Sequence, residues 1–314
     1  MELNQLRGFL MVARTGSFTR AAEALYLTQP ALSLQVKALE TAVGELLFER
    51  RGGGLLLTPA GRILLRRAEQ MMGLLEQAEE EIAALRGVER GRLSIGTNDS
   101  YALYLLPDVV RLYRERFPGV ELRLTNSCST QVASMVADGE VDFGLVTLPL
   151  EQEPVQARPL LWREDVLACA PGHALCSQPD LGLEQLAAYP LLLLDRGSSR
   201  SLLDRLFEDA GLTPRVVIEL ASVEVIKRYV EIDLGISIIP RFAAEREIAS
   251  GSLHVTRLRW LPPRAIGLIQ RRTGYLSPAA EKFVELLQEY AATHWADRLV
   301  SAATGDGSVP DIGS

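Results

Sequence analysis

The sequence is poor in the features that mark secreted, membrane-spanning and exported proteins. Only three of its 314 residues are cysteines, Cys128, Cys169 and Cys176, and so sparse and odd a set argues against a disulfide-rich secreted scaffold and fits a reducing compartment. No run of about 18 apolar residues occurs, so no membrane span is expected. The opening MELNQLRGFLMVARTGS lacks a basic region, a long apolar stretch and a cleavage site, so we expect no export and a cytoplasmic location.

The chain also lacks the motifs on which most enzymes depend. It contains no G-x-S-x-G nucleophile motif, no phosphate-binding P-loop and no convincing G-x-G-x-x-G. Its histidines, His173, His254 and His294, are too scattered for the spacing of metal ligands. We therefore expect no catalytic residues, no metal site and no cofactor.

The sequence is rich in hydrophobic residues, and its charge is unevenly distributed. Hydrophobic residues make up 47% of the chain, enough for a sizeable core in two or three domains. The net charge is −7, but residues 1–67 carry nine Lys and Arg against five acidic residues, hence +4, which leaves −11 for the rest. A small basic head on an acidic body can still bind polyanionic DNA.

Residues 1–60 have the pattern of a winged helix-turn-helix. Apolar spacing predicts a helix over 3–14, a short helix over 20–26 capped by Ser17 or Thr19, and a third helix between Thr28 and Gly44. Two short helices joined by a tight turn are typical of DNA-binding heads, although any small helical bundle shares this pattern. Residues 46–60 predict a hairpin with a glycine-rich tip, which is either a wing or an ordinary surface turn.

Thr58 and Pro59 predict the start of a long helix that runs to about Leu85 with an apolar stripe. At 1.5 Å per residue such a helix spans roughly 40 Å, too far for its stripe to be buried against so small a head. The same helix of a second subunit is the simplest partner, and packing on the chain's own C-terminal domain is the alternative. We assign residues 58–90 to a linker and dimerisation helix.

From Arg92 onward the pattern alternates between strands and helices. The segments LSIG, VELRLT and VDFGLVT, with helices between them, predict a β-α-β-α-β unit. A second α/β unit follows, with strands near VLACA, LLLL, VVIEL and ISIIP, before the strand AIGLIQ and the helix PAAEKFVELLQEYAA. We divide residues 92–300 into subdomain I (92–161 and 267–300) and subdomain II (162–266), and expect a disordered tail over 301–314.

A set of motifs in the head resembles the signature of LysR-type transcriptional regulators. These motifs are FTRAAEAL (18–25), TQPALS (28–33), QVK (35–37), LFER (47–50) and LTPAG (57–61), with GEVDFG (139–144) and LGISIIP (234–240) extending the likeness over roughly residues 1–295. Two positions depart from the family's pattern. Leu34 stands where many relatives have a basic residue, and Glu231-Ile232-Asp233 stands where they often have small residues and glycine.

The resemblance implies an α+β multidomain fold: a winged helix-turn-helix head, a long linker helix, and two α/β subdomains like a type 2 periplasmic binding protein. It implies binding to double-stranded promoter DNA, control by a small effector, contact with RNA polymerase, and a homotetramer built as a dimer of dimers. A solute-binding transport protein would share the body's fold but would need an export signal and no basic head. The segments STQV (129–132), GLTPR (211–215) and VIKRYV (225–230) look similar to the cysteine-biosynthesis branch and suggest a sulfur-related or amino-acid-like anion.

The start of the third helix is the end expected to enter the major groove. Gln29 can pair with an adenine edge, and Pro30 and Ala31 can contact a thymine methyl group. Small polar and basic side chains further along, and arginines in the wing, suit phosphates or a narrow minor groove. The candidate DNA-binding residues are Thr28, Gln29, Pro30, Ala31, Ser33, Lys37, Arg50 and Arg51.

The effector site is expected in the cleft between the two α/β units, where strand ends meet helix starts. Hydroxyl and amide side chains recur there, and together with helix N-terminal amides they suit a carboxylate or small oxyanion, although each cluster alone would serve as a helix cap. Asp99 would repel an anion unless it faces away. The candidate effector-binding residues are Thr97, Asn98, Ser100, Ser129, Thr130, Gln131, Thr147, Ser198, Ser199 and Ser222.

Cys169 and Cys176 are near enough in the sequence to suggest a thiol switch. The simpler interpretation is that they are small core residues, because free cysteines are usually buried.

Overall fold

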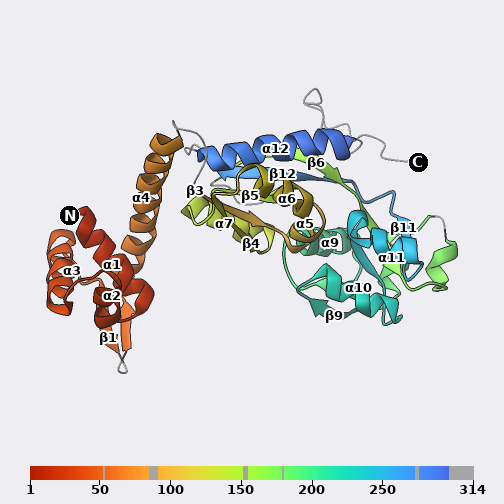
Figure 1. Cartoon of the computed structure of the whole chain (residues 1–314). Helices are drawn as coiled ribbons and strands as arrows, with labels where there is room; N and C mark the ends of the chain where they lie inside the picture. Colours follow the sequence, from red (N-terminus) through yellow and green to blue (C-terminus); the bar gives the residue numbers. More distant parts are fainter. Residues whose placement is uncertain (52–53, 85–90, 151–154, 179, 273–275, 297–314) are drawn as a thin grey trace. The chain divides into compact units, whose positions relative to one another are not determined.

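The computed structural model describes residues 1–51, 54–84, 91–150, 155–178, 180–272 and 276–296. The chain separates into two units, Met1–Ile82 and Ala83–Ser314, and each folds around hydrophobic clusters of its own (Figure 1). In the described residues no helix is both long and apolar enough to cross a membrane.

The first unit confirms the three helices, the hairpin and the long helix that the sequence predicts. Its elements are α1 (Leu3–Thr15), α2 (Phe18–Ala24), α3 (Gln29–Val43), β1 (Phe48–Arg51), β2 (Gly54–Leu57) and α4 (Pro59–Ala84). Of the two candidate caps for α2, Ser17 is the one used, since its side chain accepts a hydrogen bond from the Arg20 amide. Gly44 ends α3 with φ +82°, a left-handed conformation that favours glycine.

The head packs around aromatic and aliphatic side chains of α1, α3 and the hairpin. Phe9 and Leu39 are fully buried, and the ring of Phe48 lies 5.3 Å from that of Phe9. In the first turn of α4, a Cβ on Gly61 would lie 2.2 Å from the Leu47 carbonyl oxygen. The close approach of α4 to the hairpin therefore depends on glycine at this position.

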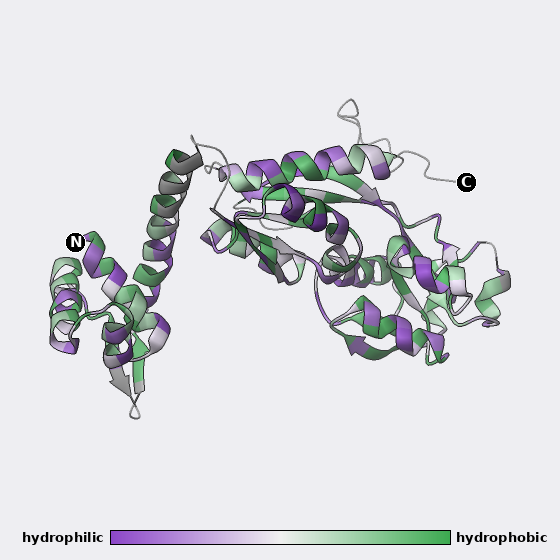
Figure 2. Cartoon of the chain, in the orientation of Figure 1, coloured by the Kyte–Doolittle hydropathy of each residue, from purple (hydrophilic) through white to green (hydrophobic). Residues whose placement is uncertain are grey.

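One side of α4 packs on the head, and described apolar side chains on its other side are exposed. Ala68 is fully buried, and Leu64, Leu65 and Met72 pack on the same cluster. Other apolar side chains of the helix are 46–68% exposed: Ile63, Met71, Leu74 and Ile82. Figure 2 shows apolar colour alternating with polar colour along α4, as the sequence periodicity predicts.

The second unit contains the remaining strands and helices. The strands are β3 (Gly91–Thr97), β4 (Val120–Asn126), β5 (Phe143–Thr147), β6 (Val155–Arg163), β7 (Asp165–Cys169), β8 (Leu191–Leu194), β9 (Val216–Leu220), β10 (Ser237–Pro240), β11 (His254–Arg257) and β12 (Arg264–Arg271). The helices are α5 (Asp99–Tyr104), α6 (Leu106–Arg116), α7 (Ser129–Asp138), α8 (Leu183–Ala187), α9 (Ser198–Asp209), α10 (Val223–Glu231), α11 (Glu245–Ser250) and α12 (Pro278–His294), with short 3-10 helices η1 (Ala174–Ser177) and η2 (Arg241–Ala244).

The described strands of this unit form three sheets, of which the five-stranded and the three-stranded ones are called the larger and the smaller sheet below. The larger has the order β4-β3-β5-β12-β6, in which β3, β4 and β5 are parallel and β12 runs antiparallel to both of its neighbours. This confirms the predicted β-α-β-α-β unit, except that the first helix is divided into α5 and α6. The smaller sheet is β10-β7-β11, beside the parallel pair β8-β9. The strands β6 and β11 were not among those the sequence predicts.

The chain passes between the two sheets at two neighbouring points. It leaves the larger sheet at Arg163, the last residue of β6, and enters the smaller one at Asp165. It returns at Arg264, the first residue of β12, and Arg264 pairs with Arg163 across the two strands. The subdomain boundaries placed at 161/162 and 266/267 thus lie inside β6 and β12 rather than between the sheets.

The turn after α10 has an unusual backbone. Asp233 adopts φ +59°, the left-handed region that glycine enters most easily. In this segment the sequence departs from the small residues and glycine of the family. The left-handed conformation is adopted here by Asp233 rather than by a glycine.

Candidate DNA interface and ligand cavity

The start of α3 presents an exposed polar and apolar surface. Thr28, Gln29, Pro30 and Lys37 are exposed, and Ala31 and Ser33 are partly exposed. Thr28 caps the helix, because its hydroxyl accepts a hydrogen bond from the Ala31 amide. Buried residues on the opposite face, Leu32, Val36 and Leu39, hold α3 against the rest of the head.

Gln29 and Ser33 are joined on this surface. Gln29 Nε2 donates a hydrogen bond to Ser33 Oγ at 2.8 Å. Among the described residues Gln29 Oε1 has no partner, so it is free to accept from a base edge. Leu34, 68% exposed, adds to the apolar surface that Pro30 and Ala31 begin.

The wing is described only in its backbone. Strands β1 and β2 pair antiparallel, with Arg50 opposite Leu55 and Arg51 opposite Gly54. The side chains of Arg50 and Arg51 and the tip residues 52–53 lie outside the described part of the chain.

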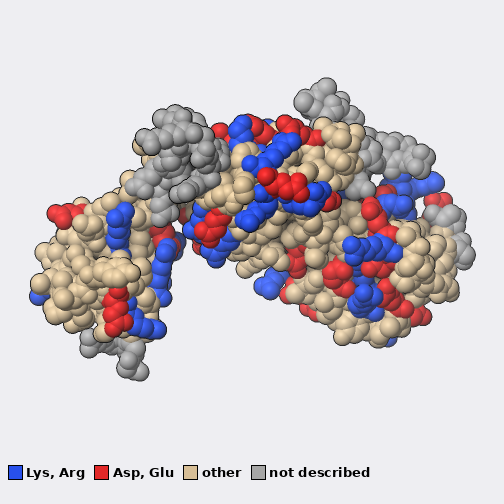
Figure 3. Space-filling view, in the orientation of Figure 1, with Lys and Arg blue, Asp and Glu red and all other residues tan. Residues whose placement is uncertain are grey.

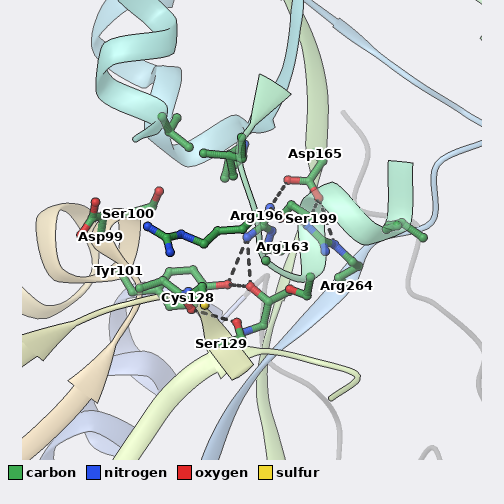
Figure 4. A pocket seen from close by; sticks show the side chains of 18 of the residues that line it. Asp99, Ser100, Tyr101, Cys128, Ser129, Arg163, Asp165, Arg196, Ser199 and Arg264 are labelled. Atoms are coloured by element: carbon green, nitrogen blue, oxygen red, sulfur yellow. Dashed lines mark hydrogen bonds and ion pairs between the residues drawn. The ribbon is translucent and has the colours of Figure 1, made fainter. Parts of the chain in front are cut away.

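The second unit contains a cavity of about 260 Å³ lined by residues from the larger sheet, the smaller sheet and β8 (Figure 4). Seven of the ten residues that the sequence proposes for an effector line it: Asn98, Ser100, Ser129, Gln131, Thr147, Ser198 and Ser199. The carboxyl ends of β3 and β5 and the starts of α5, α7 and α9 meet here, as the parallel topology requires.

Three of the proposed residues do not line the cavity, and each has a local reason. Thr97 is fully buried and its hydroxyl donates to the Leu145 carbonyl within the sheet. Thr130 is exposed on α7, with its hydroxyl 3.3 Å from Cys128 Sγ. Ser222 caps α10 by accepting from the Glu224 amide. These three hydroxyls contact other groups of the protein. The sequence pattern alone does not distinguish such a contact from a contact with a ligand.

The most strongly charged group in the cavity was not proposed from the sequence. Arg163 and Arg264 are each 7% exposed and share the buried carboxylate of Asp165. Arg163 Nη2 donates to Asp165 Oδ1, and Arg264 Nη2 donates to Asp165 Oδ2 at 2.8 Å. Arg264 Nη2 also donates to Ser199 Oγ at 2.7 Å.

Arg163 extends this group toward the larger sheet. Its Nη1 donates to the Tyr101 hydroxyl at 3.2 Å and to Thr147 Oγ1 at 3.1 Å, and Figure 4 shows it between Tyr101 and Asp165. Its Nε is buried and has no hydrogen-bond partner among the described residues. An unmet donor at a buried charge is costly, so it marks a place where a further acceptor would be stabilising.

The electrostatics of this group favour an added negative charge. Burial alone would raise the pKa of Asp165, but the guanidinium groups of Arg163 and Arg264 outweigh it and hold that pKa below its usual value. Burial, followed by repulsion from Arg163, lowers the pKa of Arg264. Two buried guanidinium groups with one carboxylate leave a net charge of about +1 at the base of the cavity.

The rim of the cavity has a different charge balance. Asp99, Asp195 and Arg196 lie there, and Arg196 Nε is 3.5 Å from Asp195. Asp99 accepts a hydrogen bond from Asn126 Nδ2 at 2.6 Å. The face shown in Figure 3 likewise carries interspersed acidic and basic side chains over the second unit. Among the residues that line the cavity, the excess of positive charge therefore lies at the buried base.

A second buried cation lies away from the cavity lining. Lys227 of α10 is 2% exposed, and its Nζ donates to the Tyr104 hydroxyl at 2.8 Å, the Ala243 carbonyl at 2.6 Å and Glu247 Oε1 at 2.9 Å. Glu224 Oε1 is also 2.8 Å away. Burial lowers the pKa of Lys227, but these partners outweigh it and raise the pKa above its usual value. We call this set the Lys227 network.

The described residues contain no group of three or more His, Cys, Asp or Glu side chains that could hold a metal ion.

Two family descriptions together match most of the chain. "Bacterial regulatory helix-turn-helix protein, lysR family" matches residues 3–62 and "LysR substrate binding domain" matches residues 86–292. The HTH-type transcriptional regulator CfxR of Cupriavidus necator is 34% identical over 294 residues, 93% of this chain and 92% of its own length. A RuBisCO operon transcriptional regulator of Allochromatium vinosum is 34% identical over 297 residues, 94% of this chain and 98% of its own length.

Solved structures give the same result for the fold. A full-length OxyR variant from Pseudomonas aeruginosa superposes with a TM-score of 0.69 at 27% identity, covering 92% of this chain and 94% of its own. Full-length CbnR in complex with its target DNA superposes with a TM-score of 0.64 at 23% identity, covering 92% and 99%. The latter similarity concerns the fold alone.

Proposed function

The chain belongs to the LysR family of bacterial transcriptional regulators, and on that premise we propose that a small anion bound at Arg163 and Arg264 sets its activity. As a member of this family it is a DNA-binding transcriptional regulator with an effector-binding domain, and it is not an enzyme. The relatives compared above are not named for cysteine biosynthesis, so a sulfur-containing effector has no advantage over other anions.

The observation that carries the proposal is the incomplete pairing of the buried arginines. Two guanidinium groups share one carboxylate, and Arg163 Nε lacks a partner in the part of the chain that the structure describes. A carboxylate or another oxyanion would neutralise the remaining charge, and arginine's planar donors suit either group. The hydroxyls of Ser199 and Thr147 stand beside the arginines and can complete the binding of such an anion.

The position of the arginines explains how binding would affect the whole unit. Arg163 and Arg264 lie at the two points where the chain passes between the sheets. A ligand that contacts them together with Ser129 of one subdomain and Ser199 of the other would favour one relative orientation of the two subdomains. Contacts between subunits would then carry that change to the DNA-binding heads.

Calorimetry with a matched pair of variants tests the effector site. Sulfate, phosphate, simple carboxylates and simple phosphate monoesters are titrated into the parent, Ser199→Ala and Thr130→Val. We expect Ser199→Ala to lose about 1.5–3 kcal/mol of binding free energy for the best ligand, the value of a hydrogen bond to a charged group. Thr130→Val, which alters a hydroxyl outside the cavity, should bind like the parent. Equal affinity in all three proteins would refute the site.

We propose that the exposed start of α3 reads the operator, with Thr28, Gln29, Pro30, Ala31, Ser33 and Lys37 on the face and Arg50 and Arg51 in the wing. Gln29 is its principal base contact, since Oε1 is free while Nε2 is bound to Ser33. Gln29→Ala should weaken binding to an operator selected from random DNA by about 1–3 kcal/mol and leave binding to unrelated DNA nearly unchanged. Electrophoretic titration at fixed salt measures both, and an equal loss on both DNAs would show that Gln29 reads no base.

We further propose that α4 pairs with the α4 of a second subunit, and that two such dimers form the tetramer. Its exposed side chains Met71 and Leu74 would lie in the seam. Leu74→Glu should lower the mass seen in sedimentation, whereas Leu74→Met should leave it unchanged. If Leu74→Glu sediments like the parent, the seam lies elsewhere. On family grounds we also propose that the assembly contacts RNA polymerase at the promoter and acts in the cytoplasm.

A further inference from the structure

Two cysteines of the second unit are in contact although they are separated in the chain. Cys169 is the last residue of β7 and Cys176 lies in η1, and their Sγ atoms are 3.6 Å apart. Both are free thiols. Neither lines the ligand cavity, whereas the third cysteine, Cys128, does.

The backbone holds the two thiols in different ways. Cys169 is 1% exposed, and its strand is paired on both sides, with β10 and with β11. Cys176 is only partly buried, on a single turn of 3-10 helix that His173 caps by accepting from the Leu175 amide at 3.2 Å. A short helix turn next to a fixed strand can move by the small distance that separates sulfur contact from a sulfur–sulfur bond of about 2.05 Å.

We propose that Cys169 and Cys176 form a reversible intrachain disulfide when the protein meets a peroxide. The thiol contact carries this proposal, and it is independent of the anion site. Two cysteines that served only as core residues would need neither mutual contact nor access to solvent for one of them.

Accessibility sets the order of the two steps. The thiolate of Cys176 attacks one oxygen of hydrogen peroxide, hydroxide leaves, and Cys176 becomes a sulfenic acid. The sulfur of Cys169 then attacks that of Cys176, the sulfur–sulfur bond forms, and water leaves after a proton transfer. The two thiols lose two electrons and two protons, and the peroxide is reduced to two waters. Burial raises the pKa of Cys169 to about 12, which makes it a poor first nucleophile and leaves that role to Cys176.

Intact mass and thiol counting on the native full-length chain test the proposal. After treatment with hydrogen peroxide and removal of the excess, we expect the free thiols to fall from three to one, with a mass loss of about 2 Da that dithiothreitol reverses. Digestion without reductant should yield a peptide pair joined through Cys169 and Cys176. The oxidised protein should melt at a higher temperature than the reduced one, since the bond constrains the unfolded chain.

Single substitutions separate this bond from other oxidation products. Cys128→Ser should still form the disulfide. Cys169→Ser should instead accumulate a sulfenic acid on Cys176 that dimedone traps, and Cys176→Ser should lose neither of its thiols at the same peroxide dose. A native chain that keeps three thiols, or that forms only crosslinks through Cys128 or between chains, would overturn the proposal.

Discussion

The second unit contains two buried cationic groups that differ in how completely their donors are paired. The Lys227 network surrounds one ammonium group with four oxygen atoms, two of them from carboxylates. The cavity places two guanidinium groups around one carboxylate and, among the described residues, leaves the donor Arg163 Nε without a partner. In the Lys227 network the buried atom without a described partner is an acceptor, Glu247 Oε2, and the ammonium group itself is fully paired. Both groups are buried, Lys227 at 2% exposed and each arginine at 7%, so burial does not tell them apart.

On the proposed function, this difference separates the buried charge that binds a ligand from the one that is part of the structure. A buried cation with all its donors paired has no further need of a ligand, and its network fixes the packing of the helices around it. The Lys227 network joins Tyr104 of α5 to α10, η2 and α11. An incompletely paired cation is costly alone, and a ligand anion lowers that cost.

The largest effect should come from removing the carboxylate that the two arginines share. Asp165→Asn keeps the shape but leaves two buried guanidinium groups without a counter-charge, so we expect a loss of about 3–5 kcal/mol in the free energy of unfolding. Added sulfate or phosphate should restore more stability to this variant than to the parent. Urea unfolding with and without the anion measures both effects.

Two comparisons make the Asp165 experiment decisive. Asp99→Asn changes a carboxylate at the rim of the same cavity and should alter stability by no more than about 0.5 kcal/mol. Folding lowers the pKa of the Asp165 carboxyl. Its contribution to the free energy of unfolding is therefore complete above the unfolded-state pKa of roughly 3.9, and it is lost as the pH falls through the folded-state pKa. The difference in the free energy of unfolding between the parent and Asp165→Asn should therefore become smaller at acidic pH. If Asp165→Asn were as stable as the parent, burying the two guanidinium groups without a counter-charge would carry no cost in the free energy of unfolding.

The DNA-binding head could be predicted closely because its determinants are local. Ser17, Thr28 and Gly44 act within three residues of the helix ends that they define, so their roles follow from the sequence alone. Residues such as Asn98 and Ser129 could also be placed at the cavity, since they follow strands whose ends must meet.

The charged base of the cavity could not be predicted in this way. Asp165 and Arg264 are 99 positions apart, and only the pairing of β6 with β12 brings Arg264 beside Arg163. The strand that carries Arg163 also escaped prediction, because its sequence VQARPLLWR lacks regular alternation and contains a proline. Likewise Thr97 and Thr130 look alike in the sequence, and only the structure shows that neither lines the cavity, since Thr97 is fully buried and Thr130 is exposed on α7.

A smaller effect, on stability alone, should follow from breaking the Lys227 network. Lys227→Met keeps the length of the side chain but leaves Glu247, whose side chain is 12% exposed, without its cation. We expect a loss of about 1–3 kcal/mol in the free energy of unfolding, less than for Asp165→Asn because Glu224 is 39% exposed and can be hydrated. Combining Lys227→Met with Glu247→Leu should recover part of that loss, as an apolar pair replaces the unpaired carboxylate. Anion affinity in calorimetry should match the parent in both proteins, because neither residue lines the cavity. A fall in anion affinity as large as that expected for Ser199→Ala would mean that the Lys227 network is part of the effector site.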